Sequence, residues 1–421
     1  MTEVDGTAAV SRGARTNTLL SIGAQLVGSA TNFVALLLMA RAGDAGEFGT
    51  VAIAFSLYLI ALAVVRAVVA EPLLIRHQLD DELFRSRLAS WAALSIALPA
   101  ACVVAIVGVV AGSAAFTPIL TLAACLPPLI WQDTQRYQRF AMRRPEFVIA
   151  YDASWLGLFL VGYMIFGAGS RGPAAVWASW CISGGLVGLA LLIRHPRVPS
   201  ARAAFGWLRS HWDLSLPLLA ESATVAITGN VALLILVAIS GSSATGAIRA
   251  TTSLFGGLTI LYLGLSSALI GYAQRSDGSR RRIQLWSTAV MVVAAIAITL
   301  VLVAVPDDLG TKLLGETWLP VSLLLVPFGF AMTMSVSSTG AQIGLRAQGR
   351  AGAIYRARLL SSPFALALPI AGAVIDDAVG FCIGLGLASA IASVLLWRFA
   401  GHGFDGRSAV HAVLPEGDAL V

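Results

Sequence analysis

Four ionisable residues lie inside long apolar stretches of this sequence: Arg66, Asp152, Glu221 and Arg249. A charge at the centre of a bilayer costs roughly 2.5–3.5 kcal/mol on insertion scales, so each of the four is a candidate functional residue. A guanidinium can hold an anion through charge-assisted hydrogen bonds, and a buried carboxylate can take up a proton because burial disfavours its charged form. Structural roles stay open: Arg66 and Asp152 can pair with each other, both arginines can extend toward a membrane surface, and Glu221 can pair with a neighbouring arginine.

Uncharged polar residues follow helical spacing in several of the same stretches. Asn17, Gln25 and Asn32 fall on one face of the first stretch, together with Ser21 and Ser29. Thr224 and Thr228 follow Glu221 at helical spacing, and Gln342 lies four residues after Ser338. Such stripes either form hydrogen bonds between helices or line a hydrated cavity, and four of them in two matching halves favour the cavity.

The composition requires that these residues be carried by membrane-spanning helices. Hydrophobic residues make up 57% of the 421 positions and charged residues only 12%, with a mean hydropathy of +0.83. A soluble domain usually carries roughly 25% charged residues. About 20 apolar residues span a bilayer as a helix, and we predict twelve such helices: 16–40, 48–70, 88–111, 114–131, 147–168, 173–193, 214–239, 246–272, 284–305, 318–343, 354–375 and 379–399.

The basic residues indicate the topology. The N-terminus, the even-numbered loops and the C-terminus carry 23 of the 28 arginines and lysines, whereas the odd loops carry only Arg41, Arg171 and Lys312. Because basic loops stay on the cytoplasmic side, we predict that both termini are inside. The net charge of +6 is spread over short loops without one basic patch, which argues against binding to nucleic acid.

The predicted helices divide into two halves of six. We expect a cytoplasmic N-terminal segment at 1–15, an N-lobe at 16–193, a basic cytoplasmic linker at 194–213, a C-lobe at 214–399 and a cytoplasmic tail at 400–421. Six crossings return the chain to its starting side, so the halves would be parallel repeats. The linker segment 203–212 is predicted either as an interfacial helix, with Phe205, Trp207, Leu208 and Trp212 against lipid, or as a plain basic linker.

Short motifs add a family resemblance. The segment Arg41-Ala-Gly-Asp-Ala-Gly-Glu-Phe48-Gly49, the run Glu71-Pro72-Leu-Leu and the segment Gly246-Ala-Ile-Arg249 resemble the polysaccharide flippases of the multidrug/oligosaccharidyl-lipid/polysaccharide (MOP) exporter superfamily, which are MATE-like. The first turn lacks the proline typical of that family, and Gly257 stands where a proline is common.

The resemblance implies a fold, a substrate class and a location. It implies an all-α polytopic membrane protein of two six-helix lobes that is a transporter and not an enzyme. The substrate would be a lipid-linked glycan precursor on a polyprenyl diphosphate, such as that of O-antigen, lipopolysaccharide or another polysaccharide, moved across the bacterial plasma (inner) membrane by alternating access. Arg249 and Arg66 would hold the diphosphate, the polar stripes would meet the sugars, and glycan-biosynthesis enzymes and membrane lipids would be partners. No cofactor is expected, and coupling to H⁺ or Na⁺ stays open.

Three other classes remain. A MATE-type multidrug or cation antiporter is the nearest alternative, although the first helix lacks the carboxylate expected to bind cations. A major facilitator transporter also has two parallel halves, but only the loop near Asp277 faintly resembles its signature. A membrane glycosyltransferase or glycan polymerase would use the pairs Asp307-Asp308 and Asp376-Asp377, yet the outer loops are too short to hold an acceptor. The sequence has no glycine-rich loop for ATP hydrolysis.

Overall fold

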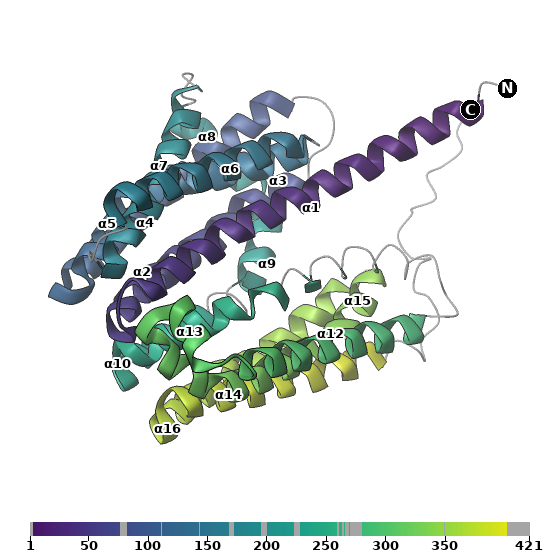
Figure 1. Ribbon diagram of the computed structural model, residues 1–421. Helices are drawn as coiled ribbons and strands as arrows, with labels where there is room; N and C mark the ends of the chain where they lie inside the picture. The colour runs from purple at the N-terminus through teal and green to yellow at the C-terminus, as the bar shows by residue number, and fades with distance from the viewer. Residues whose placement is uncertain are drawn as a thin grey trace, which may run out of the picture.

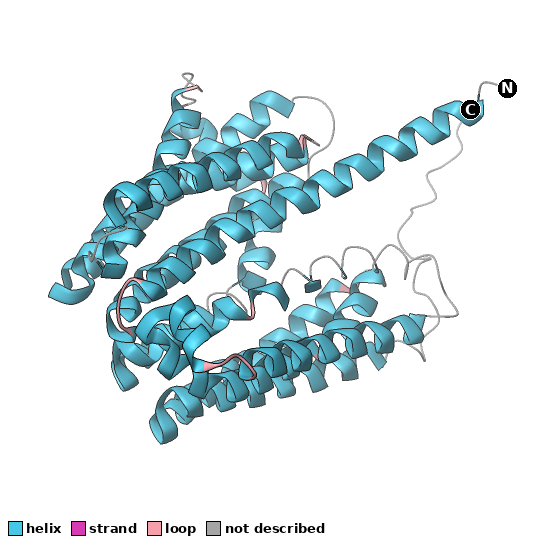
Figure 2. Cartoon of the chain, viewed as in Figure 1, coloured by secondary structure: helices cyan, strands magenta, loops and turns pink. Residues whose placement is uncertain are grey.

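The computed structural model describes residues 3–75, 82–110, 112–142, 144–167, 172–194, 200–222, 228–258, 261–262, 265, 269, 280–348 and 350–401. Every regular element among these residues is a helix, as Figure 2 shows. The predicted all-α class is therefore confirmed.

The first half of the chain forms long helices joined by short connections (Figure 1). The elements are α1 (Glu3–Arg41), α2 (Ala45–Val65), the π-helix η1 (Arg66–Ala70), α3 (Glu71–Ile75), α4 (Glu82–Val110), α5 (Ser113–Ala141), α6 (Pro145–Gly162), the π-helix η2 (Tyr163–Gly167) and α7 (Gly172–Ile193).

The second half begins with two short helices and continues with long ones. The elements are α8 (Ala201–Ser210), α9 (Trp212–Ser222), α10 (Thr228–Leu254), α12 (Arg280–Val303), α13 (Asp307–Leu314), the 3₁₀ turn η4 (Gly315–Thr317), α14 (Trp318–Val336), α15 (Thr339–Ala347) and α16 (Ala351–Gly401).

Local sequence explains where several helices begin or turn back. Asp44 caps α2, because its side chain accepts a hydrogen bond from the Glu47 amide at 2.8 Å. Within α10, Gly241 has a φ of 80°, a left-handed conformation that glycine adopts without strain. Within α16, Asp376 and Asp377 leave the helical conformation, and the backbones of Gly372 and Gly380 meet across the turn. Both α10 and α16 are therefore helical hairpins.

The lengths of the helices and their apolar surfaces are those of a membrane protein. Ten helical stretches among the described residues are long and apolar enough to cross a bilayer, and two of them, 228–254 and 352–401, contain the hairpins just described. Large apolar side chains such as Val110, Ile193 and Leu319 lie on the molecular surface. The protein is a multi-pass membrane protein, in which such an apolar surface faces lipid.

The helices form two bundles, α1–α7 and α10–α16 (Figure 1). We call the end with residues 42–44, Gly241 and residues 376–377 the turn end, and the opposite end, where α1 begins and α16 ends, the terminal end. The bundles lie close together at the turn end, and their axes diverge toward the terminal end. The largest helix–helix contact in the described chain joins α2 to α10. The core is continuous across both bundles and includes Phe48, Trp177 and Phe328.

The linker contains an amphipathic helix, α8, which packs on α4. Phe205 and Trp212 are exposed, as the interfacial interpretation requires. Trp207 is buried and stacks on His211, with 4.1 Å between ring centroids, and Leu208 packs against the core. The prediction that all four apolar residues face lipid is therefore wrong for Trp207 and Leu208, because α4 covers that side of the helix.

Helix α5 corrects one predicted boundary. The apolar stretch was predicted to end at residue 131, but α5 continues to Ala141. The polar residues of the last three turns are covered by neighbouring helices instead of water, and Gln132, Asp133, Gln135 and Gln138 are all buried. The assignment of Arg136 to a solvated loop is wrong for the same reason, since its side chain is only 13% exposed.

Candidate functional site

Near the turn end, the backbones of α2 and α10 touch with no side chain between them. We call this contact between the two bundles the seam. A Cβ atom added to Gly49 of α2 would lie 1.8 Å from the carbonyl oxygen of Ser242, and one added to Gly246 of α10 would lie 2.2 Å from that of Ala45. No side chain fits at either position. Two of the short motifs, 41–49 and 246–249, thus form one interface, and Thr317 joins it by donating a 2.8 Å hydrogen bond to the Ala40 carbonyl.

Arg249 lies on this seam, less than a turn beyond Gly246. Its side chain is buried, its Nη2 donates to Ser56 Oγ of α2 at 2.6 Å and to Asn230 Oδ1 at 3.1 Å, and its guanidinium carbon lies 5.2 Å from the centre of the Phe55 ring. Its Nε has no hydrogen-bond partner. Within the part of the chain that the structure describes, no carboxylate pairs with it. Burying an unpaired charge costs several kcal/mol, so this arginine is not a simple packing residue.

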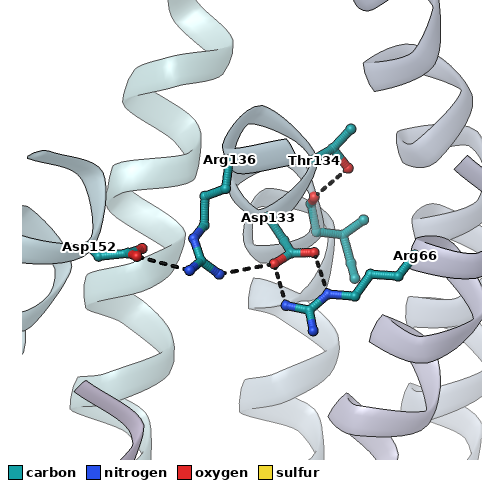
Figure 3. Close-up of polar contacts among 6 residues, drawn as sticks. Arg66, Asp133, Thr134, Arg136 and Asp152 are labelled. Atoms are coloured by element: carbon teal, nitrogen blue, oxygen red, sulfur yellow. Dashed lines mark hydrogen bonds and ion pairs between the residues drawn. The ribbon is translucent and has the colours of Figure 1, made fainter. Parts of the chain in front are cut away.

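A second set of charges lies inside the first bundle, where four residues form an ion chain (Figure 3). Arg66 donates to both oxygens of Asp133, from Nε at 2.9 Å and from Nη2 at 2.6 Å. Arg136 then links Asp133, at 3.3 Å, to Asp152 of α6, at 3.0 Å. Two positive and two negative charges balance, so the ion chain is electrically neutral as a unit.

The backbone at Arg66 departs from a regular α-helix. Residues 66–70 are a π-helix, an irregularity frequently found at functional sites. Pro72 has no amide hydrogen, so the carbonyl of Val68 cannot receive an α-helical bond from it. Ser215 of α9 donates to that carbonyl at 2.8 Å. The second half of the chain therefore docks on the first half at a defect that Pro72 creates.

The close approach of α1 fixes the other end of the ion chain. A Cβ at Gly28 would lie 2.8 Å from Arg136 Nη2 and 2.9 Å from Asp152 Oδ2. Glycine at position 28 thus lets α1 cover the pair between Arg136 and Asp152 and shield it from lipid and water. Since breaking one partner of a buried ion pair costs about 3–5 kcal/mol, the ion chain holds α2, α5 and α6 in register.

The predicted site residues do not form one site. The predicted pairing of Arg66 with Asp152 is wrong, because Arg66 forms an ion pair with Asp133 and Asp152 forms one with Arg136. Arg249 lies apart from both, on the seam. Its predicted extension toward the membrane surface is also wrong, because the side chain is buried between the bundles.

The polar stripes have mixed outcomes. Gln25 and Asn32 are exposed on α1, whereas Gln342 is buried, accepts from the Tyr262 hydroxyl at 3.1 Å and donates to Ser338 Oγ at 2.8 Å. Thr228 opens α10 and is partly buried. Contact with a substrate remains a prediction for all of these residues. Thr224 and the side chains of Asn17 and Glu221 lie outside the described residues.

Asp133 and Arg136 are the charged residues that the sequence analysis missed. They follow the apolar stretch that was predicted to end at residue 131, and so they fell in the predicted basic loop before residue 147. Their spacing of three residues, with Gln132, Gln135 and Gln138 interleaved, is a helical pattern that could have revealed them. Gln135 and Gln138 both donate to Ser90 Oγ of α4, so the buried polar face extends beyond the ion chain. The described residues contain no group of three or more metal-ligating side chains.

The arrangement of the bundles is that of a known class of membrane transporter. Neither a protein-family model nor a curated protein matches the sequence. Solved structures do match, and they are MATE transporters and a lipid II flippase, both of the MOP superfamily. The chain therefore has the fold of MOP-superfamily transporters.

Three of these structures cover nearly the whole chain. The lipid II flippase MurJ in an inward closed conformation aligns with a TM-score of 0.69 and 10% identity, over 90% of this chain and 87% of its own. An inward-facing multidrug resistance MATE family transporter gives 0.62 and 14%, over 89% and 94%. The eukaryotic MATE transporter AtDTX14 gives 0.61 and 15%, over 93% and 98%. At these identities the likeness establishes the fold alone.

Proposed function

We propose that this protein moves a lipid-linked glycan precursor, carried on a polyprenyl diphosphate, across the bacterial plasma membrane by alternating access. The observation that carries the proposal is Arg249, a buried cation at the junction of the two bundles that has no carboxylate partner in the described chain. A diphosphate supplies the missing negative charge. The fold is shared with transporters that include a lipid II flippase, which supports a substrate of this kind.

The seam suggests how binding and movement are coupled. In this structure Arg249 donates to a neutral hydroxyl, Ser56 Oγ, on the opposite bundle. Hydrogen bonds from a guanidinium to an anionic oxygen are roughly twice as strong as neutral ones. A phosphate oxygen arriving between the bundles would therefore displace Ser56, and loss of that link would loosen the seam at Gly49 and Gly246.

The proposed topology assigns each end of the molecule to one side of the membrane. We propose twelve spans, with the two hairpins counted as two crossings each, and both termini inside. The turn end then faces outward, and the structure represents a state closed to the outside. A first lobe at 16–193 and a second at 214–399 would rock about the seam, although α9 of the second lobe packs on η1 and α3 of the first. Membrane lipids and glycan-assembly enzymes are the partners that this function requires.

The experiment uses variants of the full-length protein in a strain whose own glycan export depends on it. Arg249→Gln should slow export and cause lipid-linked glycan to accumulate on the inner leaflet, by roughly 10- to 100-fold if one charged hydrogen bond of about 1.5–3 kcal/mol is lost. Arg249→Lys keeps the charge and should retain part of the activity. The control is Arg281→Gln, an exposed arginine on α12. Export by Arg249→Gln equal to the control, at equal protein level, would refute the proposed role.

A multidrug or cation antiporter is the second candidate, since MATE transporters share the fold. A cation site would need a carboxylate free to bind it. The ion chain supports the glycan reading, because Asp133 and Asp152 are both paired with arginines. Any coupling to H⁺ or Na⁺ through the ion chain would have to release Asp152, which is held by Arg136 alone among the described residues. Drug sensitivity without glycan accumulation after deletion would favour the antiporter.

A further inference from the structure

A basic pocket opens at the terminal end of α16, between its two arms and away from the seam. It has a cavity volume of about 650 Å³, within the range of ligand sites in proteins. Three arginines line it, one from the connection between α15 and α16 and one from each arm, and apolar side chains complete it: Arg350, Arg356, Arg398, Leu360, Leu395 and Phe399.

The pocket lies on the lipid-facing side of the second bundle. The opposite face of the α16 hairpin carries Ile354, Ala357 and Leu396, which are buried against α15. On the pocket side, Leu360 is 54% exposed and Phe364 is 44% exposed. Large apolar side chains exposed in this way are surface for acyl chains in a membrane protein.

The charges of Arg350 and Arg356 are not balanced by acidic residues of the described segment around them. Between Trp318 and Gly401 the only acidic residues are Asp376 and Asp377, at the hairpin turn. A helix rises 1.5 Å per residue, so the 20 residues from Arg356 to Asp376 place them roughly 30 Å away. Arg350 and Arg356 make no ion pair with any described residue, and α16 begins at Ala351, so its positive N-terminal end adds to the field.

A second groove continues the pocket on the other side of Arg398. It has a volume of about 480 Å³, and its lining includes Met334, Val394 and Trp397. Three arginines that line one pocket, with apolar side chains on both sides of Arg398, match a molecule with a phosphate head and two hydrocarbon chains. A free phosphate has no hydrocarbon that could contact the apolar grooves.

We propose that this pocket binds the headgroup of an anionic phospholipid, with the acyl chains lying along Leu360 and Phe364 on one side and along Val394 on the other. The guanidinium groups contact phosphate oxygens in pairs, which is the geometry that favours arginine over lysine. Basic pockets between transmembrane helices are suited to such headgroups. The site is independent of the proposed transport function.

The test measures lipid binding to the purified full-length protein by native mass spectrometry. The probes are phosphatidylglycerol and phosphatidylcholine, which have the same chains and differ in net charge. We expect phosphatidylglycerol to be retained in preference to phosphatidylcholine. The triple variant Arg350→Gln, Arg356→Gln, Arg398→Gln should weaken phosphatidylglycerol binding by roughly 100-fold, because each basic residue near a membrane surface contributes about 1 kcal/mol, a factor of about 5.

Two further variants separate the effect of the pocket from a general effect of removing positive charge. Arg194→Gln, Arg281→Gln, Arg282→Gln removes the same charge from exposed positions outside the pocket and should leave binding unchanged. Gly352→Trp places a bulky side chain at the pocket while keeping all three arginines, and a Cβ atom at position 352 meets no atom within 4 Å, so the backbone there has room for a side chain. Loss of binding in Gly352→Trp at unchanged thermal stability would support the site.

Three outcomes would overturn the proposal. One is equal binding by the pocket triple variant and the control triple variant. Another is equal retention of phosphatidylcholine and phosphatidylglycerol. The third is displacement of phosphatidylglycerol by inorganic phosphate or pyrophosphate at matched concentration, which would make this a site for the free anion.

Discussion

The seam between the bundles is the feature most open to a quantitative test, through Gly246→Ala. The added Cβ would lie 2.2 Å from the Ala45 carbonyl oxygen, whereas ordinary contacts begin at 3.4 Å, so α2 and α10 must separate by about 1 Å. Such overpacking costs about 1–3 kcal/mol. If the opened state holds 1% of the molecules, it rises to roughly 5% at the lower cost and above half at the higher one.

Distance measurements between spin labels would detect this shift. Labels at Thr117→Cys on α5 and Lys312→Cys on α13 lie on different bundles at the turn end, both at exposed positions, once the exposed Cys102 is replaced by serine. We expect Gly246→Ala to add a longer component to the distance distribution. The matched control is Gly157→Ala, whose Cβ meets no atom within 4 Å. A distribution identical to that of the control would refute the account of the seam as a packing lock.

Three further changes test the contacts that hold the first bundle. Asp133→Asn removes the buried carboxylate between two partly buried arginines and should destabilise the protein by about 3 kcal/mol, measured as a lower unfolding temperature than in the exposed control Asp308→Asn. Gly28→Ala should cost about 1–3 kcal/mol by overpacking at the ion chain, and an unfolding temperature equal to wild type would contradict the close approach of α1. Ser215→Ala leaves the Val68 carbonyl unsatisfied and should cost about 1–3 kcal/mol, visible as faster hydrogen exchange in η1; unchanged exchange would mean that another donor reaches that carbonyl.

The membrane class and the order of helices could be predicted because they depend on local properties. Apolar length identifies a spanning helix without any knowledge of its neighbours. The same logic explains the failure at α5: residues 132–141 are polar, and polarity alone cannot distinguish a helix in water from one whose polar face is covered by protein. The coverage by α4 and α6 is a fact of the tertiary structure.

The sequence singled out three of the buried or partly buried charged residues described above, but it missed Asp133 and Arg136 and did not predict the pairings. Arg66, Asp152 and Arg249 could be identified because a charge inside any membrane-spanning helix is energetically unfavourable. Which acid meets which arginine depends on the rotation and depth of each helix, and these place Asp133 of α5 beside Arg66. The π-helix at Arg66 adds a local rotation of this kind.

The sequence by itself determined that the chain spans a membrane many times and that its helices carry a few costly charges. These conclusions follow from hydropathy and composition, which act residue by residue. Only the tertiary structure decided that Gly49 and Gly246 face each other across one seam, that Arg249 lies there with no carboxylate partner among the described residues, and that four other charges neutralise one another in the first bundle. The reason is physical: close packing and ion pairing are properties of pairs of surfaces, and the partners are separated by up to about two hundred residues along the chain.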